Sequence, residues 1–392
     1  MLNFSFNIPT KVYFGQGQIS VLSDAIKEYG TKVLIVSYGK ASPKELAIVD
    51  AALTQMKENG ITCYQLRNVE PNPRIASVRE GVAVCREKGI DLVLAIGGGS
   101  VIDCAKAIAA STYYDGDPWE LMIHYDRMGK VLPLGCISTM AASGTELDAS
   151  AVLSDPDTNQ KVAIFGNGIY PRFSILDPTY TVSIPKYQTA AGGCDILSHV
   201  MEVYFSADDP MCLSNTIAEA MMKSCIHFTR RAYNTPDDLE ARANLMWLAG
   251  WAINGFISAG KAMDWTIHPI EHEVSAYYNV THGAGMAALT PYWMEYLLDD
   301  STVDRFYRFA VNVMGVMPGE DKMAVAKAGI QALRDFYAEV NMPKNLREMG
   351  AKDDKLEEMA HAAIVHTAFG DTLHGPKDLD WRDLYEILKA AY

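Results

Sequence analysis

The chain has 392 residues, of which 49% are hydrophobic and 21% are charged, and this is the composition of an ordinary globular protein. A chain of this length is longer than the chains that usually fold around a single hydrophobic core, so two domains are expected. The formal net charge of −14 argues against a protein that binds nucleic acid or an anionic membrane surface, because both functions need clustered positive charge.

Strands and helices alternate through the first half of the chain. Short apolar runs predict strands at residues 32–37, 62–66 and 91–96. Amphipathic patterns predict helices at residues 45–59, 75–88 and 101–111. This alternation is typical of a mostly parallel sheet that is covered by helices on both faces.

Near Ile184 and Pro185 the alternation stops. The following half shows no convincing strand, and its long apolar or amphipathic stretches predict helices at residues 213–233, 239–254, 301–314 and 321–340. We therefore expect an α/β domain at residues 1–186 and an all-helical domain at residues 187–392.

The seven cysteines are scattered, odd in number and without a Cys-x-x-Cys pair. This usage is typical of thiols in a reducing compartment and not of a disulfide framework. The N-terminus lacks the basic and apolar regions of a signal peptide, and no apolar stretch approaches the ~20 residues that cross a bilayer. We expect a cytoplasmic protein, and a homodimer is the default expectation for a soluble oligomer.

A run of glycines lies between a predicted strand and a predicted helix, and it comprises Gly97, Gly98, Gly99 and Ser100. Glycine lets the backbone approach a phosphate closely, and the helix N-terminus offers free N–H groups to it. The motif is neither Gly-x-Gly-x-x-Gly, because Ile102 takes the place of the last glycine, nor a Walker A loop. Phosphate binding and a plain tight turn are both open, and the place at the end of a parallel strand favours phosphate.

Acidic and histidine side chains with helical spacing occur in the second half. Asp195 and His199 lie four positions apart, so a helix places both on one face. His268 and His272 have the same spacing, and His282 lies within fifteen residues of His268. A carboxylate with three imidazoles, from Asp195, His199, His268 and His282, suits Fe²⁺, Zn²⁺, Co²⁺ or Mn²⁺. The alternative is a set of buried polar pairs that cap helices.

Several segments together resemble the iron-containing (group III) alcohol dehydrogenase family, and its butanol dehydrogenase and NADPH-dependent aldehyde reductase branch in particular. The resemblance runs from about residue 3 to the C-terminus and is carried by residues 69–74, 97–103, 117–121, 175–181, 190–205 and 263–287. It implies a dinucleotide-binding α/β domain followed by a helical domain, with the active site in the cleft between them.

The resemblance also implies roles for individual residues. It places the metal on Asp195, His199, His268 and His282, and it places His272 near the nicotinamide. It implies that the glycine run holds the cofactor pyrophosphate. Further cofactor contacts would fall on Asn72, Asp103, Thr139, Ser143 and Lys161.

The sequence departs from the family in three places. Asp148 stands where the family usually has Asn, which would alter a cofactor contact. Residues 38–42 replace a triple glycine and serine of the aldehyde-reductase branch. Tyr278-Asn279 replaces the usual Tyr-Asp. None of these changes falls on a proposed metal ligand.

The loop that follows the first predicted strand bears on the choice of cofactor. An acid there would bind the ribose 2′-hydroxyl and repel a 2′-phosphate. The loop instead offers Gly39, Lys40 and Ser42, and no acid lies between Lys32 and Lys44. We therefore expect NADP(H) to be preferred over NAD(H). The alternative is that Lys40 is a solvated loop lysine and both cofactors serve.

These observations predict a metal-dependent NAD(P)H oxidoreductase that interconverts primary alcohols and aldehydes, with Fe²⁺ or Zn²⁺ as a Lewis acid. His272 is the candidate for proton relay, with packing or cofactor orientation as its alternative role. A lyase or a polyol or glycerol-type dehydrogenase on the same scaffold is the alternative function. Phosphorylated substrates need several bases, whereas Lys261 is the single base near the metal residues. A non-catalytic sensor or assembly protein that binds the metal or the nucleotide is the third possible function.

Overall fold

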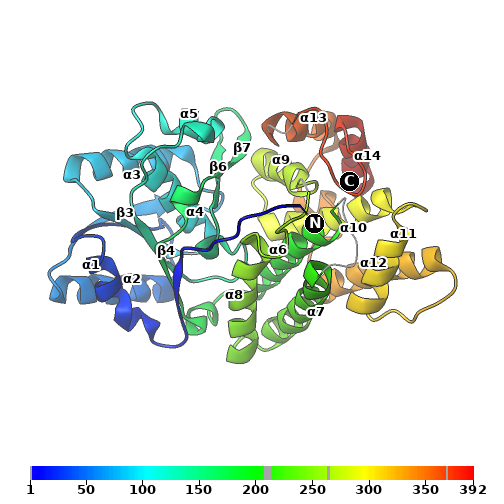
Figure 1. Ribbon diagram of the computed structural model, residues 1–392, viewed down its shortest axis with the longest axis horizontal. Helices are drawn as coiled ribbons and strands as arrows, with labels where there is room; N and C mark the ends of the chain where they lie inside the picture. The colour runs from blue at the N-terminus through cyan, green and yellow to red at the C-terminus, as the bar shows by residue number, and fades with distance from the viewer. Residues whose placement is uncertain (1, 207–212, 263–264, 368–369) are drawn as a thin grey trace. The chain divides into compact units, whose positions relative to one another are not determined.

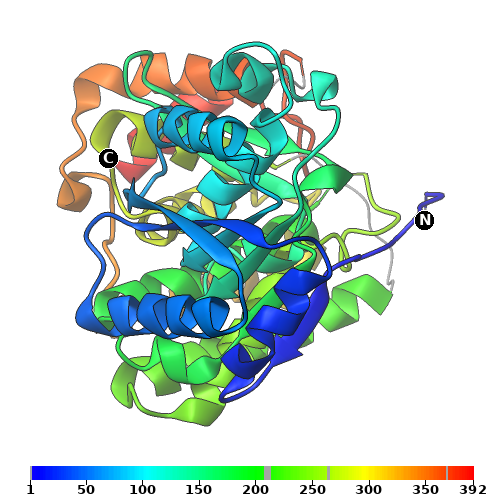
Figure 2. The same ribbon diagram turned by 90° about the vertical axis from the view of Figure 1, so that its left-hand side faces the viewer.

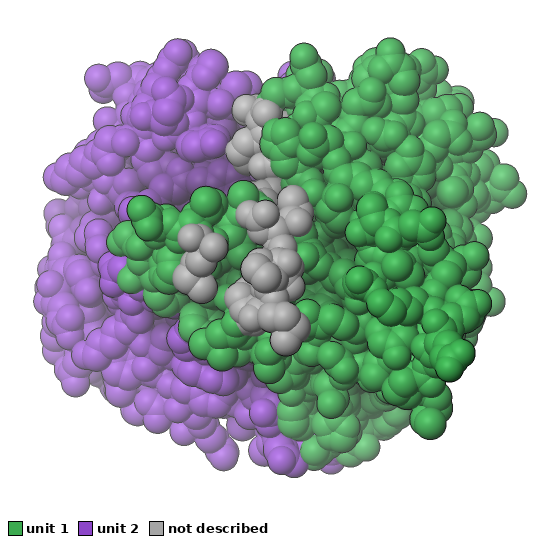
Figure 3. Space-filling view, turned by 45° about the vertical axis from the view of Figure 1, so that its right-hand side comes forward, with its two compact units in different colours: residues 1–6, 185–236, 255–392 green, residues 7–184, 237–254 purple. Residues whose placement is uncertain are grey.

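The computed structural model describes residues 2–206, 213–262, 265–367 and 370–392. The chain forms two compact units, which Figure 3 colours separately. Unit 1 comprises residues 1–6, 185–236 and 255–392, and unit 2 comprises residues 7–184 and 237–254. Unit 2 thus takes in a segment from the second half of the chain. The two domains expected at residues 1–186 and 187–392 stay a prediction.

Unit 2 contains a six-stranded parallel sheet in the order β1-β8-β5-β4-β2-β3. Its strands are β1 (Lys11–Phe14), β2 (Lys32–Tyr38), β3 (Thr62–Val69), β4 (Leu92–Gly97), β5 (Leu134–Ser138) and β8 (Phe173–Leu176). A separate antiparallel pair joins β6 (Ser150–Asp155) and β7 (Gln160–Phe165). The helices of this unit are α1 (Leu22–Lys27), α2 (Pro43–Glu58), α3 (Ile75–Lys88), α4 (Gly99–Ser111), α5 (Pro118–Ile123) and α8 (Leu239–Ile253).

The strand period of two decides which helices pack on which face of the sheet. Val33 and Ile35 of β2 belong to one buried cluster, together with side chains of α1 and α2. Leu34 and Val36 belong to another, together with side chains of α3 and α4. Successive side chains of a strand point to opposite faces, so a continuous apolar run needs a helical layer on each side. Figures 1 and 2 show these two layers.

Unit 1 is helical, and its described residues form no strand. Its helices are α6 (Lys186–Tyr204), α7 (Leu213–Asn234), α9 (His268–Tyr278), α10 (His282–Leu297), α11 (Val303–Arg308), α12 (Lys322–Glu339), α13 (Leu356–Thr367) and α14 (Trp381–Ala391). Helix α10 is apolar around most of its circumference because α6, α9, α12 and α14 all pack against it. Among the described residues, no helix combines the length and the hydropathy needed to cross a membrane.

The α/β half followed by a helical half confirms the predicted fold class. The predicted strands and helices of the first half recur with bounds that differ by at most three residues, whereas β1, β5, β6, β7 and β8 were not predicted. Strands β1, β5 and β8 have only four or five residues, too few for a period to stand out. In place of the helix expected at 301–314, the structure has an α-helix at Val303–Arg308 that is followed directly by a π-helix at Phe309–Val313.

The cysteines agree with the expectation of free thiols in the described part of the chain. Six of them form no disulfide, and all of these except the half-buried Cys63 are buried. Cys212 lies outside the described residues.

Candidate metal centre and cofactor loop

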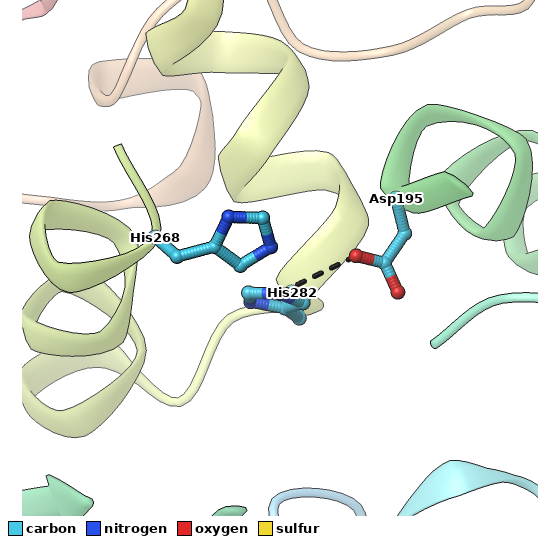
Figure 4. A group of neighbouring side chains, drawn as sticks. All are labelled: Asp195, His268 and His282. Atoms are coloured by element: carbon cyan, nitrogen blue, oxygen red, sulfur yellow. Dashed lines mark ion pairs between the residues drawn. The ribbon is translucent and has the colours of Figure 1, made fainter. Parts of the chain in front are cut away.

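Three of the four predicted metal ligands converge from different helices of unit 1. Asp195 lies in α6, His268 begins α9, and His282 begins α10. Their candidate ligand atoms all lie within 4.8 Å of one another. Figure 4 shows the three side chains facing a common space, with the Asp195 carboxylate 3.4 Å from Nε2 of His282.

His199 joins this group from the same face of α6 as Asp195. Its Nε2 lies 3.6 Å from the Asp195 carboxylate. Its ring stacks on that of His268, with the ring centroids 4.8 Å apart and the planes at 13°. The structure therefore brings all four predicted residues together, although 87 positions separate the first from the last.

The chemistry of this group fits a divalent metal ion. Asp195, His199 and His268 are each no more than 6% exposed. Nδ1 of His199 and Nε2 of His268 are buried nitrogens without a hydrogen bond to any described atom, and such groups are costly unless something binds them. Burial, together with the neighbouring His268 and His282, holds the pKa of His199 well below its ordinary value. One carboxylate and three imidazoles form a nitrogen and oxygen donor set of the kind that Fe²⁺ and Zn²⁺ accept.

Two glycines allow the helices to approach closely enough to form this group. A Cβ atom on Gly283 would lie 2.0 Å from the carbonyl oxygen of Ala191 in α6. A Cβ atom on Gly285 would lie 2.6 Å from a carboxylate oxygen of Glu271 in α9. The segment Thr-His-Gly-Ala-Gly thus places His282 at the point where α10 meets both helices.

Sequence reasoning missed two buried carboxylates that contact the histidines. Oε2 of Glu202 contacts Nδ1 of His268, and Oε2 of Glu271 contacts Nδ1 of His282. A spacing signal was present, because Glu202 follows His199 by three positions and Glu271 follows His268 by three. Residues three apart share a helix face, so both carboxylates had to lie beside the predicted ligands.

His272 lies at the edge of the group. It is half-buried, and its ring centroid is 5.6 Å from that of His282 and 6.2 Å from that of His268. With Glu271 and His282 it forms a second set of neighbouring ligand atoms. Its predicted part in proton transfer stays a prediction.

In unit 2 the glycine run occupies the C-terminal end of a central parallel strand. Gly97 ends β4, Gly98 is the N-cap of α4, and Gly99 begins that helix. A Cβ on Gly97 would lie 2.6 Å from Val101, and one on Gly99 would lie 2.5 Å from Oγ of Ser143. Neither place accepts a side chain without a shift. Gly99 and Ser100 stand in the first turn of α4, and the N-terminal N–H groups of a helix are of the kind that bind phosphate.

Two acids predicted as cofactor contacts are held by buried partners within the protein. Asp103 accepts hydrogen bonds from the Thr145 hydroxyl at 2.7 Å and from the backbone N–H of Val152 at 3.0 Å. Asp148 accepts one at 2.6 Å from Lys106, whose side chain is fully buried. Burial raises the pKa of Asp103 to about 6. Both carboxylates thus join α4 to the segment that follows β5, and their contact with a cofactor stays a prediction.

The remaining predicted cofactor contacts surround the same edge of the sheet. The backbone N–H of Thr139, directly after β5, donates to the carbonyl of Gly97 at 3.1 Å. Lys161 is 5% exposed in β7, and Asn72 has a left-handed backbone with φ of 54° after β3. These positions are compatible with a nucleotide at the strand ends, which stays a prediction.

The loop expected to determine the preference for NADP(H) over NAD(H) follows β2. A Cβ on Gly39 would lie 3.2 Å from Cα of Asn68, so the loop runs close to the backbone at the end of β3. Lys40 is exposed. The Ser42 hydroxyl accepts a hydrogen bond from the backbone N–H of Glu45, and the Glu45 carboxylate accepts one from the backbone N–H of Ser42. The Ser42 hydroxyl is therefore engaged in a capping box. Lys40 is the one charged residue among residues 39–42.

Comparisons with known proteins agree with this geometry. Residues 9–178 match the model of iron-containing alcohol dehydrogenase, and residues 189–392 match that of the Fe-containing alcohol dehydrogenase family, C-terminal. NADH-dependent butanol dehydrogenase A of Clostridium acetobutylicum is 47% identical over 392 residues and covers the whole of both chains. NADPH-dependent aldehyde reductase YqhD of Escherichia coli is 33% identical and covers 99% of this chain and 100% of its own.

Solved structures give the same result. The crystal structure of NADH-dependent butanol dehydrogenase A from Thermotoga maritima superposes with a TM-score of 0.94 at 35% identity, over 100% of this chain and 99% of that one. That of Escherichia coli YqhD has a TM-score of 0.93 at 30% identity, with coverage of 100% and 99%. The chain therefore belongs to the iron-containing alcohol dehydrogenase family.

Proposed function

We propose that the chain is a metal-dependent NAD(P)H oxidoreductase that interconverts primary alcohols and short-chain aldehydes. The observation that carries the proposal is the convergence of one carboxylate and three imidazoles in unit 1. The names of the relatives, butanol dehydrogenase and aldehyde reductase, support this reaction and this substrate class.

Asp195, His199, His268 and His282 would hold the metal ion. When bound, Fe²⁺ or Zn²⁺ would supply Lewis-acid polarisation of the substrate oxygen. The nicotinamide would supply the hydride chemistry. The glycine run would bind the pyrophosphate through backbone N–H groups of Gly99 and Ser100.

His272 would carry a proton to or from the substrate oxygen. An imidazole gains and loses a proton near neutral pH, and this side chain is half-buried next to the proposed ligands His268 and His282. The variant His272→Gln separates relay from orientation. Loss of relay lowers kcat and removes one ionisation from its pH profile, whereas loss of orientation raises KM for the cofactor.

We also propose that NADPH is preferred over NADH. Lys40 is exposed and unopposed within its loop, so it would attract the 2′-phosphate that only NADPH carries. The names of the two Clostridium relatives, at 47% and 45% identity, point to NADH, and that of the Escherichia coli relative points to NADPH. The ratio of kcat/KM with NADPH to kcat/KM with NADH measures this preference.

Lys40→Met tests the role of the loop lysine. We expect this variant to lose kcat/KM for NADPH about two- to fivefold, corresponding to about 0.5–1 kcal/mol for one screened ion pair, and to keep that for NADH. Lys57→Met is the matched control, since it removes another exposed lysine, in the last turn of α2. An unchanged cofactor ratio in Lys40→Met would show that the lysine is merely solvated.

The reaction itself is tested by oxidation of NADPH and NADH with butanal. The protein is loaded anaerobically with Fe²⁺ or Zn²⁺, and a chelated sample serves as the control. We expect turnover that depends on the metal and is lost in His268→Ala. Full turnover in the metal-free protein contradicts the proposal. Since 1,3-propanediol dehydrogenases are relatives at 29% and 28% identity, diols form the second substrate panel.

Two further expectations accompany this function. We propose a homodimer, because closed twofold dimers are the commonest soluble oligomers, and light scattering behind size exclusion measures the mass directly. We propose a cytoplasmic location, which the free thiols among the described cysteines support. Fractionation of cells that produce the protein tests it.

A further inference from the structure

We propose that Glu202 and Glu271 are positioning residues that set the tautomers of His268 and His282, so that each ring offers the lone pair of Nε2 to the metal. The proposal rests on the metal site of the proposed function. It concerns the affinity for the metal and the state of the metal-free protein, both of which are measured without turnover.

For a neutral His268 ring, the contacts of Glu202 leave one arrangement of protons. The carboxylate is 3% exposed, and its Oε1 accepts backbone N–H groups of Thr266 at 2.5 Å and Ile267 at 2.7 Å. Its Oε2 contacts Nδ1 of His268. An ionised carboxylate only accepts hydrogen bonds, so Nδ1 carries the ring proton and Nε2 keeps its lone pair. Nε2 of His268 is buried and makes no hydrogen bond to a described atom, as a nitrogen reserved for a metal would be.

Glu271 does the same for His282 from another helix. Its side chain is fully buried, its Oε1 accepts the hydroxyl of Ser275 one turn further along α9, and its Oε2 contacts Nδ1 of His282. The remaining nitrogen of the ring, Nε2, lies 3.4 Å from the Asp195 carboxylate. The deprotonated Nε2 and the carboxylate thus face the same space, as two ligands of one cation do.

The two carboxylates differ in what else they hold. Glu202 lies on the face of α6 that carries Asp195 and His199, and through Thr266 and Ile267 it also holds the backbone that enters α9. Glu271 accepts the hydroxyl of Ser275 within α9 and contacts His282 at the start of α10. Glu202 therefore sets both the place of His268 and its tautomer, whereas the contact of Glu271 with Nδ1 sets the tautomer of His282.

Replacement of each glutamate by glutamine reverses the proton arrangement with little change of shape. In Glu202→Gln the amide oxygen can still accept from Thr266 and Ile267, while the amide NH₂ faces Nδ1 of His268. The ring must then accept at Nδ1, which moves its proton to Nε2 and blocks that nitrogen as a ligand. Glu271→Gln has the same consequence for His282.

The test measures the Zn²⁺ dissociation constant by competition with a chromophoric chelator. We expect Glu202→Gln and Glu271→Gln each to weaken Zn²⁺ binding about 10–100-fold. Glu273→Gln is the matched control, because Glu273 lies on α9 and contacts Nδ1 of His366 at 2.7 Å, a histidine outside the metal group. We expect this control to bind Zn²⁺ as the wild type does.

A spectroscopic measurement reports the tautomer itself. In metal-free protein labelled with ¹⁵N at histidine, the His268 and His282 rings of the wild type should show the Nδ1–H pattern, and each glutamine variant should switch its own ring to the Nε2–H pattern. Wild-type Zn²⁺ affinity in both variants, or equal weakening in Glu273→Gln, overturns the proposal.

Folding and the proposed reaction are controlled separately. Circular dichroism and thermal unfolding of the metal-free variants establish that they fold. If Glu202→Gln does not fold, Glu271→Gln carries the test, because the backbone N–H groups of Thr266 and Ile267 keep their acceptor, Glu202, in that variant. A wild type that binds Zn²⁺ but reduces no aldehyde would refute the proposed function and leave this inference standing.

Discussion

Gly283→Ala tests whether close approach of α10 to α6 builds the metal centre. The new Cβ would lie 2.0 Å from the carbonyl oxygen of Ala191, where ordinary contact begins near 3.4 Å, so the two helices must separate by about 1.4 Å at this point. The obstacle is backbone and cannot rotate away. Overpacking of this kind costs about 1–3 kcal/mol of stability. His282 is the adjacent residue, and metal sites tolerate displacements of only about 0.2 Å, so metal affinity should fall at least tenfold.

The assay combines urea unfolding of the metal-free protein with chelator competition for Zn²⁺. Gly129→Ala is the control, since a Cβ there meets nothing within 4 Å and its backbone φ is not positive. We expect Gly129→Ala to match the wild type within about 0.5 kcal/mol. If Gly283→Ala keeps both the stability and the metal affinity of the wild type, the helix contact does not position His282 and the reasoning is refuted.

Three further predictions concern other parts of the molecule. Lys106→Met should destabilise unit 2 by about 3–5 kcal/mol in urea unfolding, because Asp148 would lose its buried partner; a loss below 1 kcal/mol would contradict this. Burial raises the pKa of Glu146 to about 7, so this group favours the folded state when protonated, and its contribution is lost as pH rises from about 4.5 through 7. Glu146→Gln should therefore exceed the wild type in stability at pH 8 and lose that advantage near pH 4.5, whereas a constant difference would exclude this cause. Asp380→Ala removes the capping box of α14 and should cost about 1 kcal/mol by the same assay, with full wild-type stability as the contrary outcome.

Local pattern was sufficient for much of the fold and for the candidate ligands. The helix at residues 75–88 was predicted with the bounds that the structure has, because its apolar period and the glycine that follows both mark it. Asp195 and His199 were recognisable as a pair because a helix turns a spacing of four into a shared face. The glycine run was recognisable for a similar reason, since the strand before it and the helix after it are both encoded in neighbouring residues.

The sequence by itself thus determined the alternating α/β half and the helical half, which depend on patterns within about a dozen positions, and it offered a short list of candidate metal ligands. Only the tertiary structure decided the strand order, the buried pair of Lys106 with Asp148, and the carboxylates behind His268 and His282. Glu202 meets His268 across 66 positions, and Lys106 meets Asp148 across 42. Such contacts leave no local period, because they arise when separate helices and strands bury their apolar faces against one another and bring the polar groups between them into hydrogen-bonding distance.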